Sequence, residues 1–73
     1  MDIIDKIKRL TYEKGWTIYQ LSNEAEIGQS TLTNMFTRKT LPSITTLTKL
    51  CDAFEITLSE FFEENKNIIE IFT

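Results

Sequence analysis

The residues from Gln29 to Thr37 carry an unusual number of neutral hydrogen-bonding side chains. In a helix, Leu32, Met35 and Phe36 would share one face, and the opposite face would present amides and hydroxyls. Such side chains add little to stability in water, but they can pair with base edges in the major groove of DNA. The segment therefore predicts a polar face that could read DNA, made of Gln29, Ser30, Thr33, Asn34 and Thr37.

Residues that could support other chemistry are few. One cysteine and no histidine exclude an internal disulfide, and they leave no histidine-based zinc site or catalytic triad. Cys51 belongs to an apolar helical series, which favours a buried structural thiol over a redox role. The carboxylates lie on polar helix faces, and no glycine-rich phosphate loop is present. We expect no enzyme, and no cofactor, metal or small-molecule ligand.

Charge is distributed unevenly along the chain. Residues 1–50 hold seven basic and five acidic side chains, a net charge of +2, whereas residues 51–73 hold one and six, a net charge of -5. No acid lies between Glu26 and Asp52. This segment could face phosphates without repulsion. The alternative explanation is that an acidic tail merely keeps a small domain in solution.

The length of 73 residues fits one domain with a marginal core, which dimerisation would stabilise. A composition of 41% hydrophobic and 26% charged residues is typical of a soluble globular protein. No apolar run approaches the roughly 18 residues of a membrane span. The N-terminus lacks the basic segment followed by an apolar segment that is typical of a signal peptide. We expect a cytoplasmic protein that does not enter membranes.

Capping signals predict where the helices begin. Asp2 is a good N-cap for a helix to about Lys14, and Gly15 suits the left-handed residue that ends it. The apolar positions of this helix share one face. Its charged side chains are expected to face solvent: Lys6, Lys8, Arg9 and Glu13.

A second helix is predicted over about residues 17–25, because Thr17 and Gln20 form a capping box. Trp16 and Leu21 are placed as a hydrophobic staple, which favours a structural role for Trp16 over stacking on bases. A break at residues 26–28 precedes the polar segment, which we expect to be helical over about residues 29–36. Two short helices joined by a turn of about three residues are the helix-turn-helix signature.

Similar signals continue through the second half of the chain. A loop over residues 37–41 leads to Pro42 and to Ser43, which can cap a helix over about residues 44–54. Another capping box and staple begin a fifth helix, at Ile56, Thr57, Glu60 and Phe61. Five short helices without a strand predict an all-α fold, a compact five-helix bundle.

From about residue 7 to residue 62 the chain resembles the lambda-repressor/Cro-like family of helix-turn-helix transcriptional regulators, also called the xenobiotic response element family. The resemblance implies a lambda-repressor-like DNA-binding domain over residues 1–64, of the kind found in small phage and mobile-element regulators. It depends on combined spacing, carried by Ile7, Leu10, Gly15, Leu21, Ile27, Ser30, Thr31, Leu32, Arg38, Lys39, Pro42, Ser43, Leu47, Leu50, Phe54, Ile56, Leu58, Phe61 and Phe62.

The resemblance also implies how the chain would meet DNA. In the family the first residues of the 29–36 helix enter the major groove of double-stranded DNA, which implies base contacts by Gln29, Ser30, Thr33 and Asn34. Gln29 and Asn34 can each pair bidentately with adenine, at roughly 1–3 kcal/mol of discrimination. The following loop and nearby helix starts would hold phosphates. The implied phosphate contacts are Thr17, Thr31, Arg38, Lys39, Thr40, Ser43 and Thr45.

One departure from the family pattern concerns support for the base contacts. Ile18 stands where the family usually has a glutamine that bonds both a phosphate and the first side chain of the 29–36 helix. Gln29 should therefore be less tightly oriented than in the family, unless Tyr19 or Gln20 substitutes.

Three further departures alter the turn and the surface near it. Glu26 replaces a common turn glycine, at a cost of about 1 kcal/mol if its backbone is left-handed. Phe36 replaces a common glutamate, and we expect it in the core rather than against a partner. Arg38 replaces a common glycine and adds positive charge.

Residues 65–73 form an apolar extension beyond the resemblance. If the last helix continued, a short heptad seam would form a dimer contact, and Asn65 could set its register. A two-fold dimer would present two 29–36 helices to half-sites about one helical turn apart. The alternative is that this segment folds back on its own domain. The candidate dimer contacts are Phe61, Asn65, Ile68, Ile69 and Phe72.

Two functional hypotheses follow. The first is a sequence-specific transcriptional regulator, a repressor that binds a palindromic operator as a homodimer. The second is a protein-interaction module of the same fold, antitoxin-like or regulator-binding, with weak or no DNA binding. It would use Phe36, Trp16 or the apolar tail to hold a partner. The acid-free segment favours the first hypothesis.

Overall fold

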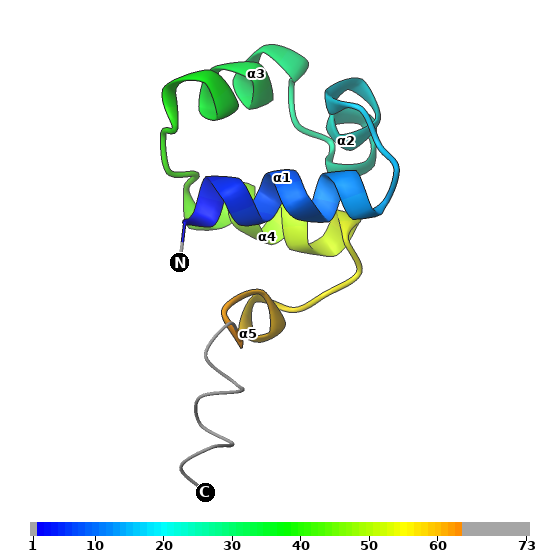
Figure 1. The fold of residues 1–73 in the computed structure, drawn as a ribbon, viewed down its shortest axis with the longest axis vertical. Coiled ribbons are helices and arrows are strands. Elements are labelled where there is room, and N and C mark those ends of the chain that lie inside the picture. Colours follow the sequence, from blue (N-terminus) through cyan, green and yellow to red (C-terminus); the bar gives the residue numbers. More distant parts are fainter. Residues whose placement is uncertain (1, 64–73) are drawn as a thin grey trace, which may run out of the picture.

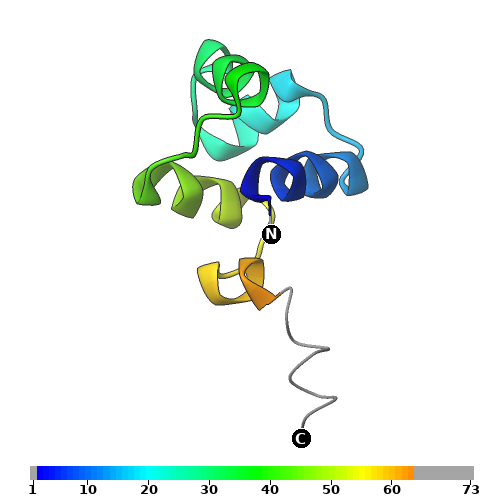
Figure 2. The same ribbon diagram turned by 60° about the vertical axis from the view of Figure 1, so that its left-hand side comes forward.

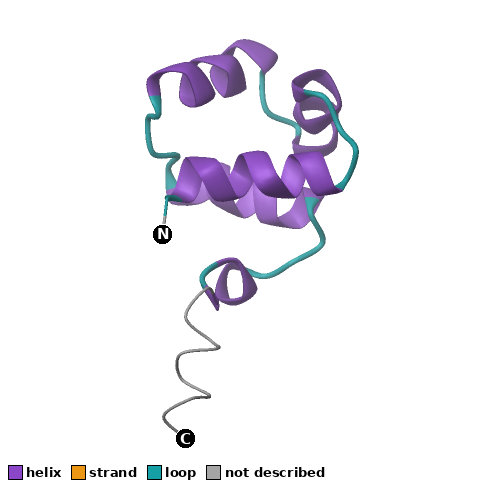
Figure 3. Cartoon of the chain, viewed as in Figure 1, coloured by secondary structure: helices purple, strands orange, loops and turns teal. Residues whose placement is uncertain are grey.

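The computed structural model describes residues 2–63, and within them five α-helices follow one another without a β-strand (Figure 3). They are α1 (Ile3–Glu13), α2 (Ile18–Ala25), α3 (Gln29–Arg38), α4 (Ile44–Ala53) and α5 (Leu58–Phe61). α1 and α4 form the middle of the molecule, with α2 and α3 on one side and α5 on the other (Figures 1 and 2). The all-α helix-turn-helix fold is therefore confirmed.

Side-chain caps begin four of these helices, as the sequence predicted. Each capping oxygen accepts a hydrogen bond from the backbone N–H three residues later, at 3.0–3.2 Å, from Asp2, Thr17, Ser43 and Thr57. Both capping boxes are complete, because Gln20 and Glu60 accept from the backbone N–H of the capping threonines in return. α3 differs: Gly28 is its N-cap and supplies no side-chain hydrogen bond.

Each of the first four helices is followed, within two residues of its end, by a residue with a left-handed backbone. The four residues have φ between 52° and 72°, and they are Gly15, Glu26, Lys39 and Glu55. After each, the next N–H donates to a carbonyl five residues earlier, at 3.0–3.2 Å, as in a Schellman motif. Glycine takes this conformation freely, whereas other residues are strained by roughly 1–2 kcal/mol. The strain expected at Glu26 is therefore present.

The end of α3 corrects one prediction. α3 continues to Arg38, two residues beyond the predicted end, so that Thr37 and Arg38 belong to the helix and not to the loop. Neither residue breaks a helix, and the left-handed turn comes only at Lys39. The loop after α3 is correspondingly shorter.

The core lies where helices α1 to α5 meet. Phe36 belongs to it, as predicted, and so does Cys51, which is 2% exposed and whose thiol pKa is raised by burial. Trp16 is half-buried and stacks on Phe54, with ring centroids 6.0 Å apart, which supports its structural role. The buried apolar residues are Ile4, Ile7, Leu21, Ala25, Leu32, Met35, Phe36, Leu47, Leu50, Cys51, Phe54 and Phe61.

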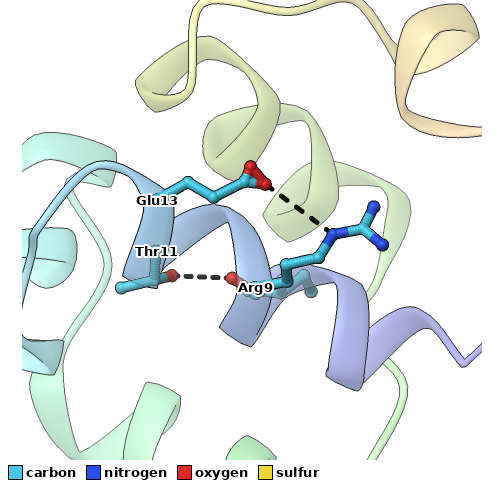
Figure 4. A network of polar contacts seen from close by, with 4 residues as sticks. Arg9, Thr11 and Glu13 are labelled. Carbon is cyan, nitrogen blue, oxygen red and sulfur yellow. Dashed lines mark hydrogen bonds and ion pairs between the residues drawn. The ribbon is translucent and has the colours of Figure 1, made fainter.

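One prediction for the charged side chains of α1 is wrong. Lys6, expected in solvent, is only 8% exposed, and its Nζ lies 5.2 Å from the centroid of the Phe61 ring. α5 lies below α1 in Figure 1, and the face of the Phe61 ring on α5 attracts the ammonium group. Figure 4 shows two further contacts of α1. The exposed Arg9 and Glu13 form an ion pair, with 3.8 Å between Nε and Oε1. The buried Thr11 hydroxyl donates a hydrogen bond to the Ile7 carbonyl at 2.7 Å.

The burial of Phe61 removes one residue from the predicted dimer contact. Its side chain is 0% exposed within this chain and packs edge-on to Phe62, so it cannot also bury surface against a partner. The other candidates, Asn65, Ile68, Ile69 and Phe72, lie outside the described residues. Within residues 2–63, no helix has the length and apolar content needed to cross a membrane.

Replacing the strained turn residue should stabilise the fold. Glu26→Gly is expected to raise the free energy of unfolding by about 1 kcal/mol, because glycine adopts φ near 55° without strain. Urea unfolding of the full chain, followed by circular dichroism, measures the change. The matched control is Glu24→Gly on α2, which should lower it by about 1 kcal/mol. Equal destabilisation by both substitutions would contradict the assignment of strain.

Candidate nucleic-acid interface

The polar face of α3 gathers the four predicted base contacts. Gln29, Ser30, Thr33 and Asn34 are all exposed, and together they line one shallow hollow on the surface. Leu32, Met35 and Phe36 are buried on the opposite face. α3 lies at the outer edge of the molecule, away from α5 (Figure 1). Its polar side chains are therefore free to meet a large ligand such as a duplex.

The longer α3 adds a residue that the predicted site had omitted. Thr37 is exposed and lies one turn beyond Thr33 and Asn34 on the same side of the helix. Its hydroxyl extends the polar face into the last turn of α3. The helical spacing already placed Thr37 on this face, but the predicted boundary at residue 36 excluded it from the helix.

The start of α3 leaves its first backbone N–H groups without a side-chain cap. Gly28 offers no oxygen to them, and the first N–H groups of a helix have no intrahelical acceptor. They lie at the end of α3 that carries Gln29 and Ser30. The positive end of the helix dipole at this position attracts an anion such as a phosphate.

The first turn of α2 holds the three residues that could have supported Gln29. The Gln20 side-chain oxygen accepts a hydrogen bond from the Thr17 N–H at 2.8 Å, so it is already used in the capping box. Ile18 is half-buried and packs against the core. Tyr19 is exposed, and the structure gives it no bond to Gln29 among the described residues. The bridge typical of the family is therefore not replaced by Gln20.

A groove between α3 and α4 collects several of the predicted phosphate contacts. Thr31, Arg38, Thr40 and Ser43 line it, together with Asn34. Base and phosphate candidates thus meet along one edge of α3. Four further residues complete the lining of the groove: Met35, Leu41, Pro42 and Thr46.

The remaining phosphate candidates lie outside this groove. Thr17 is exposed at the start of α2, and Thr45 is exposed in the first turn of α4. Lys39 lines a separate hollow with Asp2, Leu41 and residues 3 and 4 of α1. The predicted phosphate contacts are therefore distributed around α3 rather than gathered in one pocket.

Two of these candidates already have hydrogen bonds within the protein. The Ser43 hydroxyl accepts from the Thr46 N–H at 3.2 Å and donates to the Thr46 hydroxyl at 3.1 Å. The Thr17 oxygen accepts from the Gln20 N–H at 3.1 Å, which leaves its hydroxyl hydrogen available. At the start of α4, a phosphate would therefore be bound by the first backbone N–H groups rather than by the serine side chain.

The electrostatics of the site combine an acid-free stretch of sequence with a carboxylate that the fold brings close to it. Residues 27–51 carry Arg38, Lys39 and Lys49 and no acid. Asp2 lies close to Lys39 in the folded chain. A hydrogen bond from the Asp5 N–H and the charge of Lys39 lower the pKa of Asp2, so this carboxylate is ionised at neutral pH. Asp2 and Lys39 are far apart in the sequence, so the distribution of charge along the chain did not predict that they lie close together.

The arrangement of α2 and α3 is that of a helix-turn-helix DNA-binding domain. The two helices cross at a short left-handed turn, and the second exposes a neutral polar face. Residues 2–63 contain no group of acidic, cysteine or histidine side chains arranged to hold a metal ion.

Comparison with known families then gives the particular family. Residues 6–67 match the family model of the Cro/C1-type HTH DNA-binding domain, so the chain belongs to this family. No curated protein gives a significant match to the sequence. The match supports the resemblance drawn from the sequence, and it makes the chain a DNA-binding protein.

Proposed function

We propose that this protein is a sequence-specific transcriptional repressor that binds a palindromic operator as a homodimer, with α3 in the major groove. The observation that carries the proposal is the polar face of α3, where Gln29, Ser30, Thr33 and Asn34 are exposed together. Amides and hydroxyls in this arrangement suit base edges. Occupancy of the operator by the dimer is sufficient for repression in this proposal.

Phosphate contacts would fix α3 in the groove. The proposal assigns this role to the side chains of Thr31, Arg38, Lys39 and Thr40, and to the first backbone N–H groups of α2, α3 and α4. Arg38 and Lys39 end α3 with two positive charges. The neutral polar face would then discriminate between sequences, while the charged end would hold any duplex.

A homodimer would explain how so small a surface selects an operator. One copy of α3 can contact only a few base pairs, whereas two copies related by a two-fold axis contact two half-sites. Residues 65–73 remain the predicted dimer contact. This prediction depends only on their apolar sequence pattern, because they lie outside the described residues.

Selection from a random DNA pool with the full chain tests this function directly. The expected product is a set of sequences with two inverted half-sites whose centres lie about one helical turn, roughly 10 base pairs, apart. A set with one half-site would support DNA recognition without the dimer. Failure to enrich any sequence, with no salt-dependent binding at low ionic strength, would favour the protein-interaction hypothesis.

Asn34→Ala should separate sequence discrimination from affinity. We expect a loss of roughly 1–3 kcal/mol on the selected duplex and no change on unrelated DNA, because an exposed amide that pairs with a base is removed. Titrations by fluorescence anisotropy on both duplexes measure the two affinities. Asn23→Ala on α2 is the matched control and should change neither. An equal loss on both duplexes would contradict the role of Asn34 in discrimination.

Lys39 should contribute to all DNA binding. Lys39→Asn removes the charge, and asparagine tolerates the left-handed backbone at this position. We expect weaker binding to every duplex and a fall of about one unit in the slope of log affinity against log salt concentration. Lys49→Ala on the exposed surface of α4 serves as the control. A loss confined to the selected duplex would contradict a phosphate contact.

A further inference from the structure

A second hollow on the surface lies between α1, the start of α2 and the last turns of α3. Figure 1 shows α1 below α3, with α2 beside the C-terminal end of α1. None of the side chains that line this hollow is among the proposed base or phosphate contacts. We name it the aromatic hollow, and its lining residues are Lys8, Thr11, Tyr12, Trp16, Ile18 and Phe36.

Three aromatic rings meet in the aromatic hollow at different depths. Phe36 is 9% exposed and Trp16 is half-buried, whereas Tyr12 is 84% exposed, more than any other large hydrophobic side chain among the described residues. One exposed tyrosine on a surface needs no explanation. A tyrosine beside a tryptophan in a hollow is a different case, because these two residue types are over-represented among those that carry the binding energy of protein interfaces.

Two ammonium groups lie over these rings. Lys8 Nζ is 5.9 Å from the centroid of the Phe36 ring, and Lys14 Nζ is 5.8 Å from the centroid of the Trp16 ring. Within residues 2–63, no carboxylate lines the hollow. The neighbouring acid in the sequence, Glu13, is in an ion pair with Arg9. The aromatic hollow is therefore positively charged as well as apolar.

This combination defines the chemistry of an occupant. An apolar side chain would lose contact with water against the rings, and carboxylates on either side of it would meet the two lysines. A second copy bound through the same surface would bring lysines against lysines. The volume of the hollow is about 280 Å³, below the roughly 300–1,000 Å³ of sites that enclose a small molecule. A side chain of a partner protein fits these limits best.

We propose that the aromatic hollow binds an acidic segment of a partner protein, which inserts one bulky apolar side chain flanked by Asp or Glu. Tyr12 and Trp16 supply the apolar contact, and Lys8 and Lys14 supply the complementary charge. The proposal does not rest on the proposed function, because the side chains involved are different. The chain would then hold a protein partner and DNA through separate sets of side chains.

Selection from a phage-displayed library of random peptides with the full chain tests the proposal. We expect enrichment of peptides in which Asp or Glu flanks a bulky apolar residue. Trp16 is the only tryptophan of the chain, so its fluorescence reports binding of synthetic copies of these peptides at the hollow. Raising the salt concentration should weaken their binding. Matched peptides with Asn and Gln in place of the acids should bind more weakly at low salt.

Variants of the chain separate the apolar contact from the charge. Tyr12→Ala should weaken binding of the selected peptides about tenfold. Tyr19→Ala is its matched control, because Tyr19 is 54% exposed on α2 outside the hollow. Lys8→Gln and Lys14→Gln should each weaken binding about two- to threefold and reduce its salt dependence. Lys49→Gln, on the exposed surface of α4, should change neither.

Three results would overturn the proposal. The first is a selection that enriches no peptide, or only peptides without acids. The second is binding that Tyr12→Ala leaves unchanged in a variant that circular dichroism shows to be folded. The third is an equal loss of affinity for all duplexes in Lys8→Gln and Lys14→Gln, which would make these lysines phosphate contacts. None of the three contradicts the proposed function, which selection from the DNA pool tests separately.

Discussion

The burial of Leu32, Met35 and Phe36 is the interaction on which the rest of this structure depends. These three side chains are the only apolar groups on α3, and they hold the helix against the core. Because they occupy one face, the opposite face can consist of groups that contribute nothing to folding. A recognition helix needs this separation, since residues chosen for pairing with bases cannot also be chosen for packing.

The turns between the helices impose a second constraint on this small domain. Three of the four left-handed residues are not glycine, so they store strain at the ends of α2, α3 and α4. The residues that follow partly offset this cost, because Ile27 and Ile56 pack against the core immediately after their turns. Total stabilities of small domains are only a few kcal/mol, and these turns are therefore a substantial part of the balance.

Local signals in the sequence predicted most of the fold. The capping boxes at Thr17 and Thr57, the cap at Asp2 and the left-handed turn at Gly15 each depend on residues within four positions of one another. Apolar spacing likewise placed Phe36 in the core. These features were predictable because neighbouring residues alone determine them. The same periodicity predicted that the four base candidates lie on the exposed face of α3.

The errors arose where distant segments meet. The Lys6 ammonium group lies over the Phe61 ring, and Phe61 is buried in a core drawn from all five helices, so neither outcome could follow from local spacing. The proximity of Asp2 to Lys39 likewise depends on the tertiary fold. The end of α3 was misplaced by two residues because no local breaker precedes Lys39, and its left-handed conformation is fixed only in the folded chain.

The commitment of Gln20 to its own capping box has a consequence for how this domain can change over generations. Since Gln20 is held by Thr17, and since the structure gives the α3 polar face no hydrogen bond to α2 within residues 2–63, these surfaces are independent of each other. Substitutions at Gln29, Ser30, Thr33 and Asn34 can then accumulate without loss of the scaffold. Under the proposed function, the DNA target of the domain could therefore change without a change in its scaffold.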